Sequence, residues 1–314
     1  MPGLCPEGQR GSALGCGMRQ GRMLAIDWGL SAFRAWRLAR DGTAEAHIAA
    51  PEGIRAVAPG GFPEALERLL SAWPDARSAP MLLCGMVGSR QGWAEAPYAD
   101  CPARAEDIAA RLLAVPGRPG AFIVPGLLCR EGGAADVMRG EETQLIGLIP
   151  ALGPGRHRVC LPGTHSKWAE VEDGAITRFR TAMTGELYAL LRAHSTLAPV
   201  LPGDSAEDEA AFAAGLSRAA APGGLLNHLF GVRAAALAGD RAASGLPSFL
   251  SGLLIGHEIA GLGAGGGPVH IVGTAALAAR YAAALALAGR AAVVHGEAVT
   301  AAGLAAIARA RGLL

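Results

Sequence analysis

The stretch Met23-Leu24-Ala25-Ile26-Asp27-Trp28-Gly29 decides the fold, because it reads as a short buried strand that ends in an acidic residue and a glycine. Residues 32–39 alternate between apolar and polar side chains, and residues 44–49 form a third extended run. The turn Arg40-Asp41-Gly42-Thr43 separates the two runs, and Asp-Gly between alternating segments is a hairpin signal. The sequence therefore predicts three consecutive strands joined by tight turns.

The same pattern returns about 135 residues later. Residues 158–163 read as a strand that runs into a glycine turn, and residues 166–172 alternate. Asp173-Gly174 makes the next turn, and residues 175–180 form the third strand. A repeat at the length of a domain predicts two related lobes that face each other.

We place the boundary between the lobes at residue 150, where Pro150 and the glycine-rich loop 153–155 follow a predicted helix. The expected organisation is a flexible tail over residues 1–22, a first lobe over 23–150 and a second lobe over 151–314. Further helices are expected at residues 62–73, 105–114, 141–148, 184–193, 248–262, 274–288 and 298–310, with Thr184 as an N-cap, and further strands at 80–85, 121–125, 269–272 and 292–294.

Composition and charge exclude several classes of protein. The 314 residues are 51% hydrophobic, and 28 basic residues against 27 acidic residues leave a formal net charge of +1. The chain therefore lacks the basic field that non-specific nucleic-acid binding requires. The 45 glycines and the alanine-rich segments predict closely packed helices.

Cysteine spacing and hydropathy point to a cytoplasmic location. None of the 6 cysteines forms a Cys-x-x-Cys pair, so we expect reduced thiols and neither a zinc site nor a disulfide framework. No window reaches the roughly 18–20 uncharged apolar residues of a membrane span. The first 22 residues lack the continuous apolar stretch of a signal peptide.

The two glycine turns carry residue types that suit a phosphate chain. Asp27 followed by Gly29 would hold Mg²⁺ and let backbone N–H groups approach an oxyanion, although an isolated Asp-x-Gly is more often a capped β-turn. The second turn offers Gly163, Thr164 and Lys167 at the equivalent place. His165 lies in the same turn, where a loop histidine is more often a bystander.

Two further segments are candidates for the chemistry of the acceptor. Glu141 and Glu142 begin a helix, either as helix-dipole partners or as a base and a Mg²⁺ ligand for a kinase that acts on a hydroxyl group. The loop 84–93 contains Arg90, which suits the carboxylate of a polyhydroxy acid if it is not merely a solvated surface residue. Gly273 follows a strand, and its turn is either an adenosine contact or a plain α/β crossover.

These segments resemble the 2-keto-3-deoxygalactonate kinase family, within the superfamily of sugar kinases, heat-shock chaperones and actin. The resemblance covers residue 23 to the C-terminus and rests on the following strings: D-W-G at 27–29 with R-A-W at 34–36, C-G-M-V-G-S-R-Q-G-W at 84–93, V-M-R-G-E-E-T-Q-L at 137–145, L-P-G-T-H-S-K-W at 161–168, T-G-E-L at 184–187 and F-L-S-G-L-L-I-G at 249–256.

The resemblance implies an α/β, two-lobed actin-like ATPase (ribonuclease H-like) fold, with mixed sheets flanked by helices and a cleft between the lobes. It also implies ATP- and Mg²⁺-dependent phosphorylation of the C6 hydroxyl of 2-dehydro-3-deoxy-D-galactonate in galactonate catabolism. A homodimer is possible. The alternatives are a kinase for another aldonic or keto-deoxy sugar acid and a non-enzymatic actin-like nucleotide switch.

The residues expected to act are assigned by matching positions. Glu141 corresponds to the base, with Glu142 as the alternative, and Asp27 and Glu142 are the expected metal ligands. The expected ATP contacts are Asp27, Gly29, Ser31, Arg34, Gly163, Thr164, His165, Lys167 and Gly273. The expected sugar-acid contacts are Ser89, Arg90, Gln91, Trp93 and Arg139. The first turn departs from the usual D-W-G-S-T-N-x-R, because Leu30 and Ala32 replace polar residues.

Overall fold

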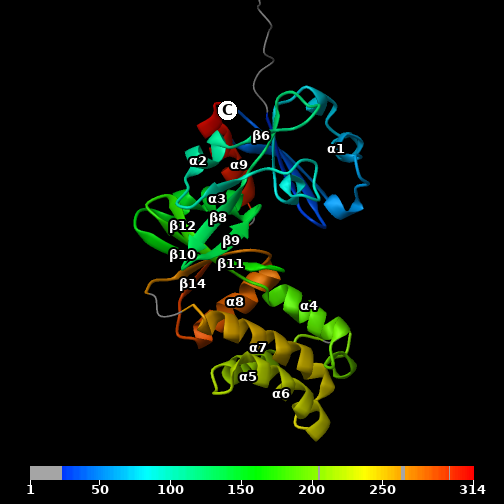
Figure 1. Ribbon diagram of the computed structural model, residues 1–314, viewed down its shortest axis with the longest axis vertical. Coiled ribbons are helices and arrows are strands. Elements are labelled where there is room, and N and C mark those ends of the chain that lie inside the picture. The colour runs from blue at the N-terminus through cyan, green and yellow to red at the C-terminus, as the bar shows by residue number, and fades with distance from the viewer. Residues whose placement is uncertain (1–22, 204–205, 263–265, 297) are drawn as a thin grey trace, which may run out of the picture.

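The computed structural model describes residues 23–203, 206–262, 266–296 and 298–314, and it has the two-lobed α/β architecture that the sequence predicts (Figure 1). The predicted tail, residues 1–22, lies outside the described residues. The sheet of the first lobe has the order β3-β2-β1-β4-β7-β6. Its strands are β1 (Met23–Trp28), β2 (Phe33–Leu38), β3 (Ala44–Ala50), β4 (Met81–Cys84), β6 (Leu113–Ala114) and β7 (Ala121–Ile123).

The sheet of the second lobe repeats this arrangement in the order β12-β11-β10-β13-β14. Its strands are β10 (Arg156–Leu161), β11 (Ser166–Glu172), β12 (Ala175–Ala182), β13 (Val269–Val272) and β14 (Ala292–His295). In both sheets three antiparallel strands come first, and parallel strands continue from the first strand of the three. The predicted internal repeat is confirmed.

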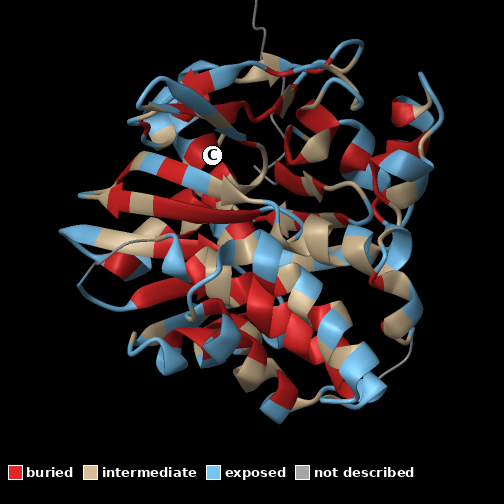
Figure 2. Cartoon of the chain, turned by 60° about the horizontal axis from the view of Figure 1, so that its bottom comes forward, coloured by how far each residue is buried: buried red, intermediate tan, exposed pale blue. Residues whose placement is uncertain are grey.

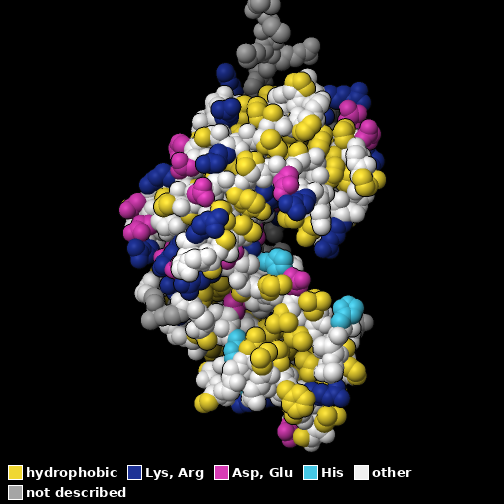
Figure 3. Space-filling model, viewed as in Figure 1, with side chains coloured by type: hydrophobic (Ala, Val, Ile, Leu, Met, Phe, Trp, Pro, Cys, Tyr) yellow, Lys and Arg dark blue, Asp and Glu magenta, His cyan; other side chains and the backbone are white. Residues whose placement is uncertain are grey.

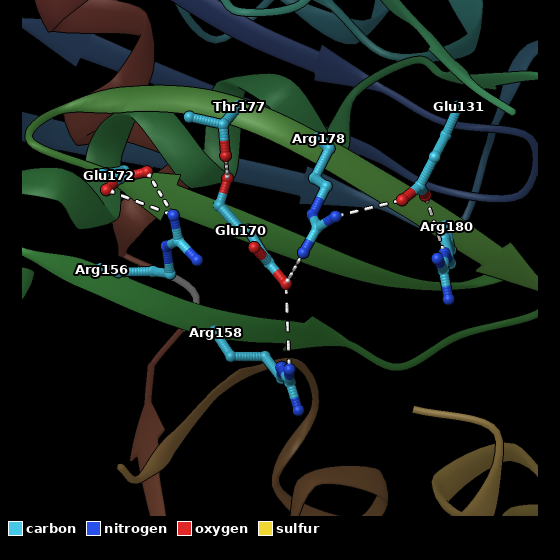
Figure 4. A network of polar contacts seen from close by, with 8 residues as sticks. All are labelled: Glu131, Arg156, Arg158, Glu170, Glu172, Thr177, Arg178 and Arg180. Carbon is cyan, nitrogen blue, oxygen red and sulfur yellow. Dashed lines mark hydrogen bonds and ion pairs between the residues drawn. The ribbon is translucent and has the colours of Figure 1, made fainter. Parts of the chain in front are cut away.

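A third sheet, β5-β8-β9, connects the lobes. Its strands are β5 (Tyr98–Asp100), β8 (Gly126–Glu131) and β9 (Ala134–Met138). The carboxylate of Asp136 in β9 accepts hydrogen bonds from the N–H and hydroxyl groups of Thr181 in β12, both at 2.6 Å. Glu131 in β8 accepts from Arg178 and Arg180 of β12, at 3.0 Å each, at the end of a ladder of alternating charges (Figure 4).

The helices flank these sheets, and buried residues line the surfaces where they meet (Figure 2). They are α1 (Phe62–Leu69), α2 (Ala105–Ala110), α3 (Glu141–Leu152), α4 (Thr184–His194), α5 (Glu209–Ala219), α6 (Gly224–Ala238), α7 (Leu246–Ala260), α8 (Ala275–Leu287) and α9 (Val299–Arg311). None of the helices in the described part of the chain is long and apolar enough to cross a membrane.

The last helix corrects the predicted division of the chain. α9 was expected in the second lobe, but it lies in the first lobe beside α2 and α3 (Figure 1). Leu304 and Ile307 of α9 are fully buried in the same core as Met23 of β1 and Leu145 of α3. The cause is the apolar face of α9, which completes the core of the first lobe. The predicted boundary at residue 150 lies within the last turn of α3.

Glycine allows the closest contact between helices, as the composition predicted. A Cβ on Gly303 of α9 would lie 1.8 Å from the carbonyl oxygen of Thr143 in α3, and one on Gly147 would lie 1.9 Å from that of Val299. α5 and α7 meet in the same way, because a Cβ on Gly252 would lie 2.0 Å from the carbonyl oxygen of Phe212.

Some local predictions are wrong. Thr184 was predicted to cap α4, but Met183 is the N-cap, and the hydroxyl of Thr184 donates instead to Glu258 of α7. α3 continues through Pro150 to Leu152, where a break was expected. α1 and α2 end several residues earlier than predicted. The sequence analysis did not identify α5, α6 or the hairpin β8–β9.

We predict that Gly303→Ala destabilises the protein by about 1–3 kcal/mol or more, because the added methyl group would overlap backbone atoms of α3 that cannot move independently. The measurement is the free energy of unfolding in urea. Gly231→Ala in α6 is the matched control, since a Cβ there meets no atom within 4 Å. Ala has the higher helix propensity, so this control should gain up to about 1 kcal/mol. Equal effects of the two substitutions would contradict the close contact.

Candidate active site

The first turn is held by an ion pair across the β1–β2 hairpin. Asp27 and Arg34 are directly opposite in the register, and Nη2 of Arg34 lies 2.7 Å from Oδ2 of Asp27. The N–H group of Gly29 donates to the carbonyl oxygen of Ala32 at 2.9 Å and closes the turn. Ser31 lies exposed at its tip. The first turn therefore presents one carboxylate, one guanidinium group, the hydroxyl group of Ser31 and exposed backbone.

The second turn joins β10 to β11 and rests on the first turn of α4. The carbonyl oxygen of Thr164 accepts from the N–H group of Glu186 at 3.0 Å, and a Cβ on Gly185 would lie 2.5 Å from the carbonyl oxygen of Gly163. His165 contacts the carboxylate of Glu186, and both side chains are partly exposed. Sequence analysis missed Glu186, although the T-G-E-L string marked its segment.

Residues from the two lobes meet between these turns. Glu141 begins α3 in the first lobe, and Nζ of Lys167 from β11 in the second lobe lies 3.8 Å from its Oε1. The Lys167 side chain is only 6% exposed, whereas that of Glu141 is 27% exposed. The backbone N–H of Arg139 donates to Oε2 of Glu141 at 3.1 Å. Figure 3 shows the molecule hollowed between the lobes.

Glu142 differs sharply from its neighbour, because it has no exposed surface. Its carboxylate accepts from the N–H of Gly140 at 2.6 Å and from the hydroxyl of Thr143 at 3.0 Å. A metal ion or a substrate cannot reach a carboxylate in this position. The structure therefore does not support the predicted roles of Glu142 as metal ligand and as alternative base.

Two glycines with positive φ keep the floor of the site open. Gly85 has φ +90°, and a Cβ there would lie 2.9 Å from Oδ1 of Asp27. Gly140 has φ +108°, and a Cβ there would lie 3.2 Å from the Cα of Gly85. Side chains at either position would fill the space between Asp27 and the start of α3. Gly85 lies in the predicted 84–93 loop, but its contact with Asp27 was not foreseen.

Burial governs the electrostatics of this group. Burial raises the pKa of Glu141, while the ammonium group of Lys167 acts to lower it and the nearby Asp27 acts to raise it. Burial, with the adjacent Glu141, raises the pKa of Glu142 to about 8. The site thus holds one accessible carboxylate beside a lysine and one buried carboxylic acid.

The predicted sugar-acid residues do not form one cluster. Arg90 is 87% exposed, and its Nε lies 3.6 Å from Glu95. Trp93 stacks on Phe62 with ring centroids 6.0 Å apart. Arg139 packs over the ring of Tyr98 at 4.5 Å and donates to the carbonyl oxygen of Ala96, which leaves its Nη1 buried without a hydrogen-bond partner among the described residues. Ser89 donates to the carbonyl oxygen of Met86, and Gln91 is exposed.

Gly273 ends β13 and lies beside the second turn, since a Cβ there would lie 3.2 Å from Cγ of Pro162. The turn leads into α8, whose outer face lines a cavity of about 530 Å³. Ala276 and Arg280 of α8 form one wall, and Phe212 of α5 and Ser248 of α7 form the other. This hollow suits a planar, partly apolar group.

Comparison with known proteins identifies the family. The model of the 2-keto-3-deoxy-galactonokinase family matches residues 27–307. The chain belongs to this family. A protein of Rhizobium meliloti (strain 1021) named as a 2-dehydro-3-deoxygalactonokinase is 42% identical over 298 residues, which are 92% of this chain and 97% of the relative. The 2-dehydro-3-deoxygalactonokinase of Escherichia coli (strain K12) is 39% identical over 241 residues, 77% of this chain and 80% of the relative.

Solved structures agree with this membership. A 2-dehydro-3-deoxygalactonokinase family protein from Sinorhizobium meliloti is 40% identical and superposes with a TM-score of 0.85 over 92% of this chain and 98% of that one. An activator of 2-hydroxyisocaproyl-CoA dehydratase from Clostridium difficile, solved with bound ADPNP, is 10% identical and has a TM-score of 0.50 over 93% and 96%. The second likeness shows the fold alone. As a member of the 2-keto-3-deoxy-galactonokinase family, the chain is a phosphotransferase.

We predict that Glu142 makes stability fall as the pH rises. The folded protein keeps the proton of Glu142 up to about pH 8, whereas the unfolded chain releases it near the ordinary value of 4.5. Between these values the folded state binds more protons, so its free energy of unfolding decreases with pH. The measurement is urea unfolding of wild type and Glu142→Gln at intervals from pH 5 to pH 8. The difference between their free energies of unfolding should narrow or reverse as the pH rises. A difference that stays constant over this range would contradict a raised pKa of Glu142.

Proposed function

We propose that this family member transfers the γ-phosphoryl group of ATP to the C6 hydroxyl of 2-dehydro-3-deoxy-D-galactonate. Beyond family membership, one observation carries the proposal. Glu141, a partly exposed carboxylate, lies beside Lys167 between two glycine turns that come from opposite lobes. A kinase that acts on a hydroxyl group needs a carboxylate near that hydroxyl and positive or N–H groups around the phosphates. We place the reaction in the cytoplasm, as a step in galactonate catabolism.

The nucleotide would lie across both turns. Backbone N–H groups at Gly29 and Ser31, with Arg34, would face the phosphates from the first lobe. Gly163, Thr164, His165 and Lys167 would face them from the second lobe. Gly273 would contact the adenosine, and the cavity along α8 offers space for its base. Backbone N–H groups in glycine turns are suitable partners for phosphate oxygens because no Cβ blocks their approach.

Asp27 fits a Mg²⁺ ion held together with the phosphates. Its side chain is 14% exposed, and the missing Cβ of Gly85 leaves space beside Oδ1. Mg²⁺ commonly takes one or two protein carboxylates and completes its shell with waters and phosphate oxygens. Bound there, the ion would neutralise phosphate charge and orient the γ-phosphoryl group.

Glu141 is the proposed base. As the C6 oxygen forms its bond to the γ-phosphorus atom, the bond from that phosphorus to the β–γ bridging oxygen breaks and ADP leaves. The C6 hydroxyl proton passes to the Glu141 carboxylate. The Arg139 N–H and the Lys167 ammonium group hold that carboxylate in place. Lys167 also favours its ionised form, which a base requires.

The sugar acid would occupy the side of the site formed by the 84–93 loop. We assign Arg90 to the substrate carboxylate, since a guanidinium group binds a carboxylate with two parallel hydrogen bonds. Ser89 and Gln91 of the same loop would contact the remaining oxygens, and Trp93 would support the loop through its stacking on Phe62. Closure of the lobes on both ligands would exclude water, which otherwise competes as a phosphoryl acceptor.

The first test is ADP release with MgATP and three acceptors: 2-dehydro-3-deoxygalactonate, its gluconate epimer and galactonate. We expect turnover of the first acid well above the other two. Turnover of the epimer or of galactonate alone would assign a different sugar acid to the same chemistry. ADP release that stays at background with all three acids, with ATP still bound, would overturn the proposal in favour of a nucleotide switch.

We predict that Glu141→Gln lowers kcat by about 10²–10⁴, the usual contribution of a general base, while the Kd for ATP changes little. Glu142→Gln is the matched control, because it changes the adjacent residue in the same way at a position with no exposed surface. This control should retain most of the turnover. Similar kcat values for wild type and Glu141→Gln would remove Glu141 from the role of base.

A further inference from the structure

A partly buried hydrogen-bond network centres on Glu258 of α7. Its Oε1 accepts from Nε1 of Trp168 at 2.6 Å, and its Oε2 accepts from the hydroxyl of Tyr281 at 2.7 Å and also from the hydroxyl of Thr184. Ser166 extends the network, since its Oγ lies 2.8 Å from the Tyr281 hydroxyl. Because Tyr281 donates its single proton to Glu258, Ser166 is the donor to Tyr281.

Each partner of Glu258 belongs to an element that carries part of the nucleotide site. Ser166 and Trp168 lie in β11, directly after the second turn. Thr184 begins α4, whose first turn supports Gly163 and Thr164. Tyr281 lies in α8, which begins directly after the Gly273 turn. Through hydrogen bonds to β11, α4 and α8, this one carboxylate therefore connects the elements that carry the second phosphate turn, its supporting helix and the adenosine turn.

The network also fixes the direction of Lys167. Side chains alternate between the two faces of a strand, so Ser166 and Trp168 point to one face of β11 and Lys167 to the other. Anchoring the two neighbours to Glu258 and Tyr281 holds the intervening backbone, and Lys167 then extends toward Glu141 in the other lobe. A change at Glu258 would reach the nucleotide site through these bonds.

A carboxylate is a costly choice for a simple structural anchor. Burial raises the pKa of Glu258, and the hydrogen bonds that its carboxylate receives act in the opposite direction. A largely enclosed carboxylate stabilises the fold only while all of its partners remain in place. Such an arrangement specifies one relative position of its elements more strongly than apolar packing does.

We propose that Glu258 is a positioning residue that sets the spacing between the second phosphate turn and the adenosine turn, and so determines nucleotide affinity. This inference rests on the proposed placement of ATP. It does not depend on which sugar acid is the acceptor. A purely structural role would lower stability and leave the affinity for nucleotide unchanged.

The test measures the Kd for ADP by calorimetry, together with the melting temperature, for wild type and three variants. Tyr281→Phe removes one hydroxyl group and keeps the ring. Glu258→Gln keeps the shape of the side chain, and its amide can still accept from Trp168 and donate to the two hydroxyl groups. His228→Gln is the control, because it changes a contact between α6 and α7, the 2.9 Å bond between the rings of His228 and His257, to which β11, α4 and α8 contribute no atom.

We expect Tyr281→Phe to raise the Kd for ADP about tenfold, which corresponds to the loss of about 1.4 kcal/mol of binding free energy. Glu258→Gln should stay close to wild type, since its amide preserves the network. His228→Gln should lower the melting temperature without changing the Kd. In turnover assays, Tyr281→Phe should raise the KM for ATP more than the KM for the acid.

Two results would overturn the inference. One is an unchanged Kd for ADP in Tyr281→Phe despite a lower melting temperature. The other is an equal increase in the Kd for ADP in Tyr281→Phe and His228→Gln. Loss of ADP affinity in Glu258→Gln alone would also contradict a positioning role, because it would point to direct contact between the carboxylate and the ligand. If the wild type binds ADP but phosphorylates none of the acids, only the proposed substrate fails. The Kd values then still decide the role of Glu258.

Discussion

The ion pair between Glu141 and Lys167, which joins the two lobes, is the constraint on which the rest of the structure depends. The two side chains come from different lobes, and they can face each other at 3.8 Å only if α3 and β11 are both held firmly. The glycine contact between α3 and α9 holds the first element, because the backbones touch at Gly303 and Thr143. The bonds of Ser166 and Trp168 hold the second. The last helix, α9, and the network around Glu258 thus both help to hold Glu141 and Lys167 next to each other.

Two adjacent carboxylates acquire different chemistry from their surroundings. Glu141 is partly exposed and has a lysine beside it, so its carboxyl group is within reach of a substrate. Glu142 is enclosed, hydrogen-bonded to its own turn, and has a pKa raised to about 8. Burial raises the pKa of both carboxyl groups, so exposure and the adjacent lysine are what divide their roles. Here the division favours Glu141 for proton transfer and leaves Glu142 to shape the start of α3.

Local sequence patterns allowed both groups of three antiparallel strands to be predicted. Contacts between segments that are distant in the sequence could not be predicted in this way. In each lobe the alternating segments and the Asp-Gly turn between them lie within about 20 residues, so the sequence identified both groups of three strands. The two glycine turns together also predicted that Asp27 and Lys167 belong to one site. The return of α9 to the first lobe depends on a core assembled from strands and helices that are distant in the sequence, and no local signal encodes it. α5 and α6 are rich in alanine and lack a clear apolar stripe. The exposure that separates Glu141 from Glu142 exists only after folding.

The repeated topology does not make the two turns equivalent, and their difference follows from side-chain chemistry. In the first turn Leu30 and Ala32 offer no polar side chains, and the functional groups are the Ser31 hydroxyl, Asp27 and the arginine paired with it. The second turn has a hydroxyl, an imidazole and a nearby ammonium group, and it contains no carboxylate. A carboxylate suits a cation, and donors suit phosphate oxygens. A Mg²⁺–nucleotide complex carries both kinds of charge, so under the proposed function its metal would bind the first lobe and its phosphate oxygens the second. Productive binding would then require both lobes at once, which would link occupancy of the site to their closure.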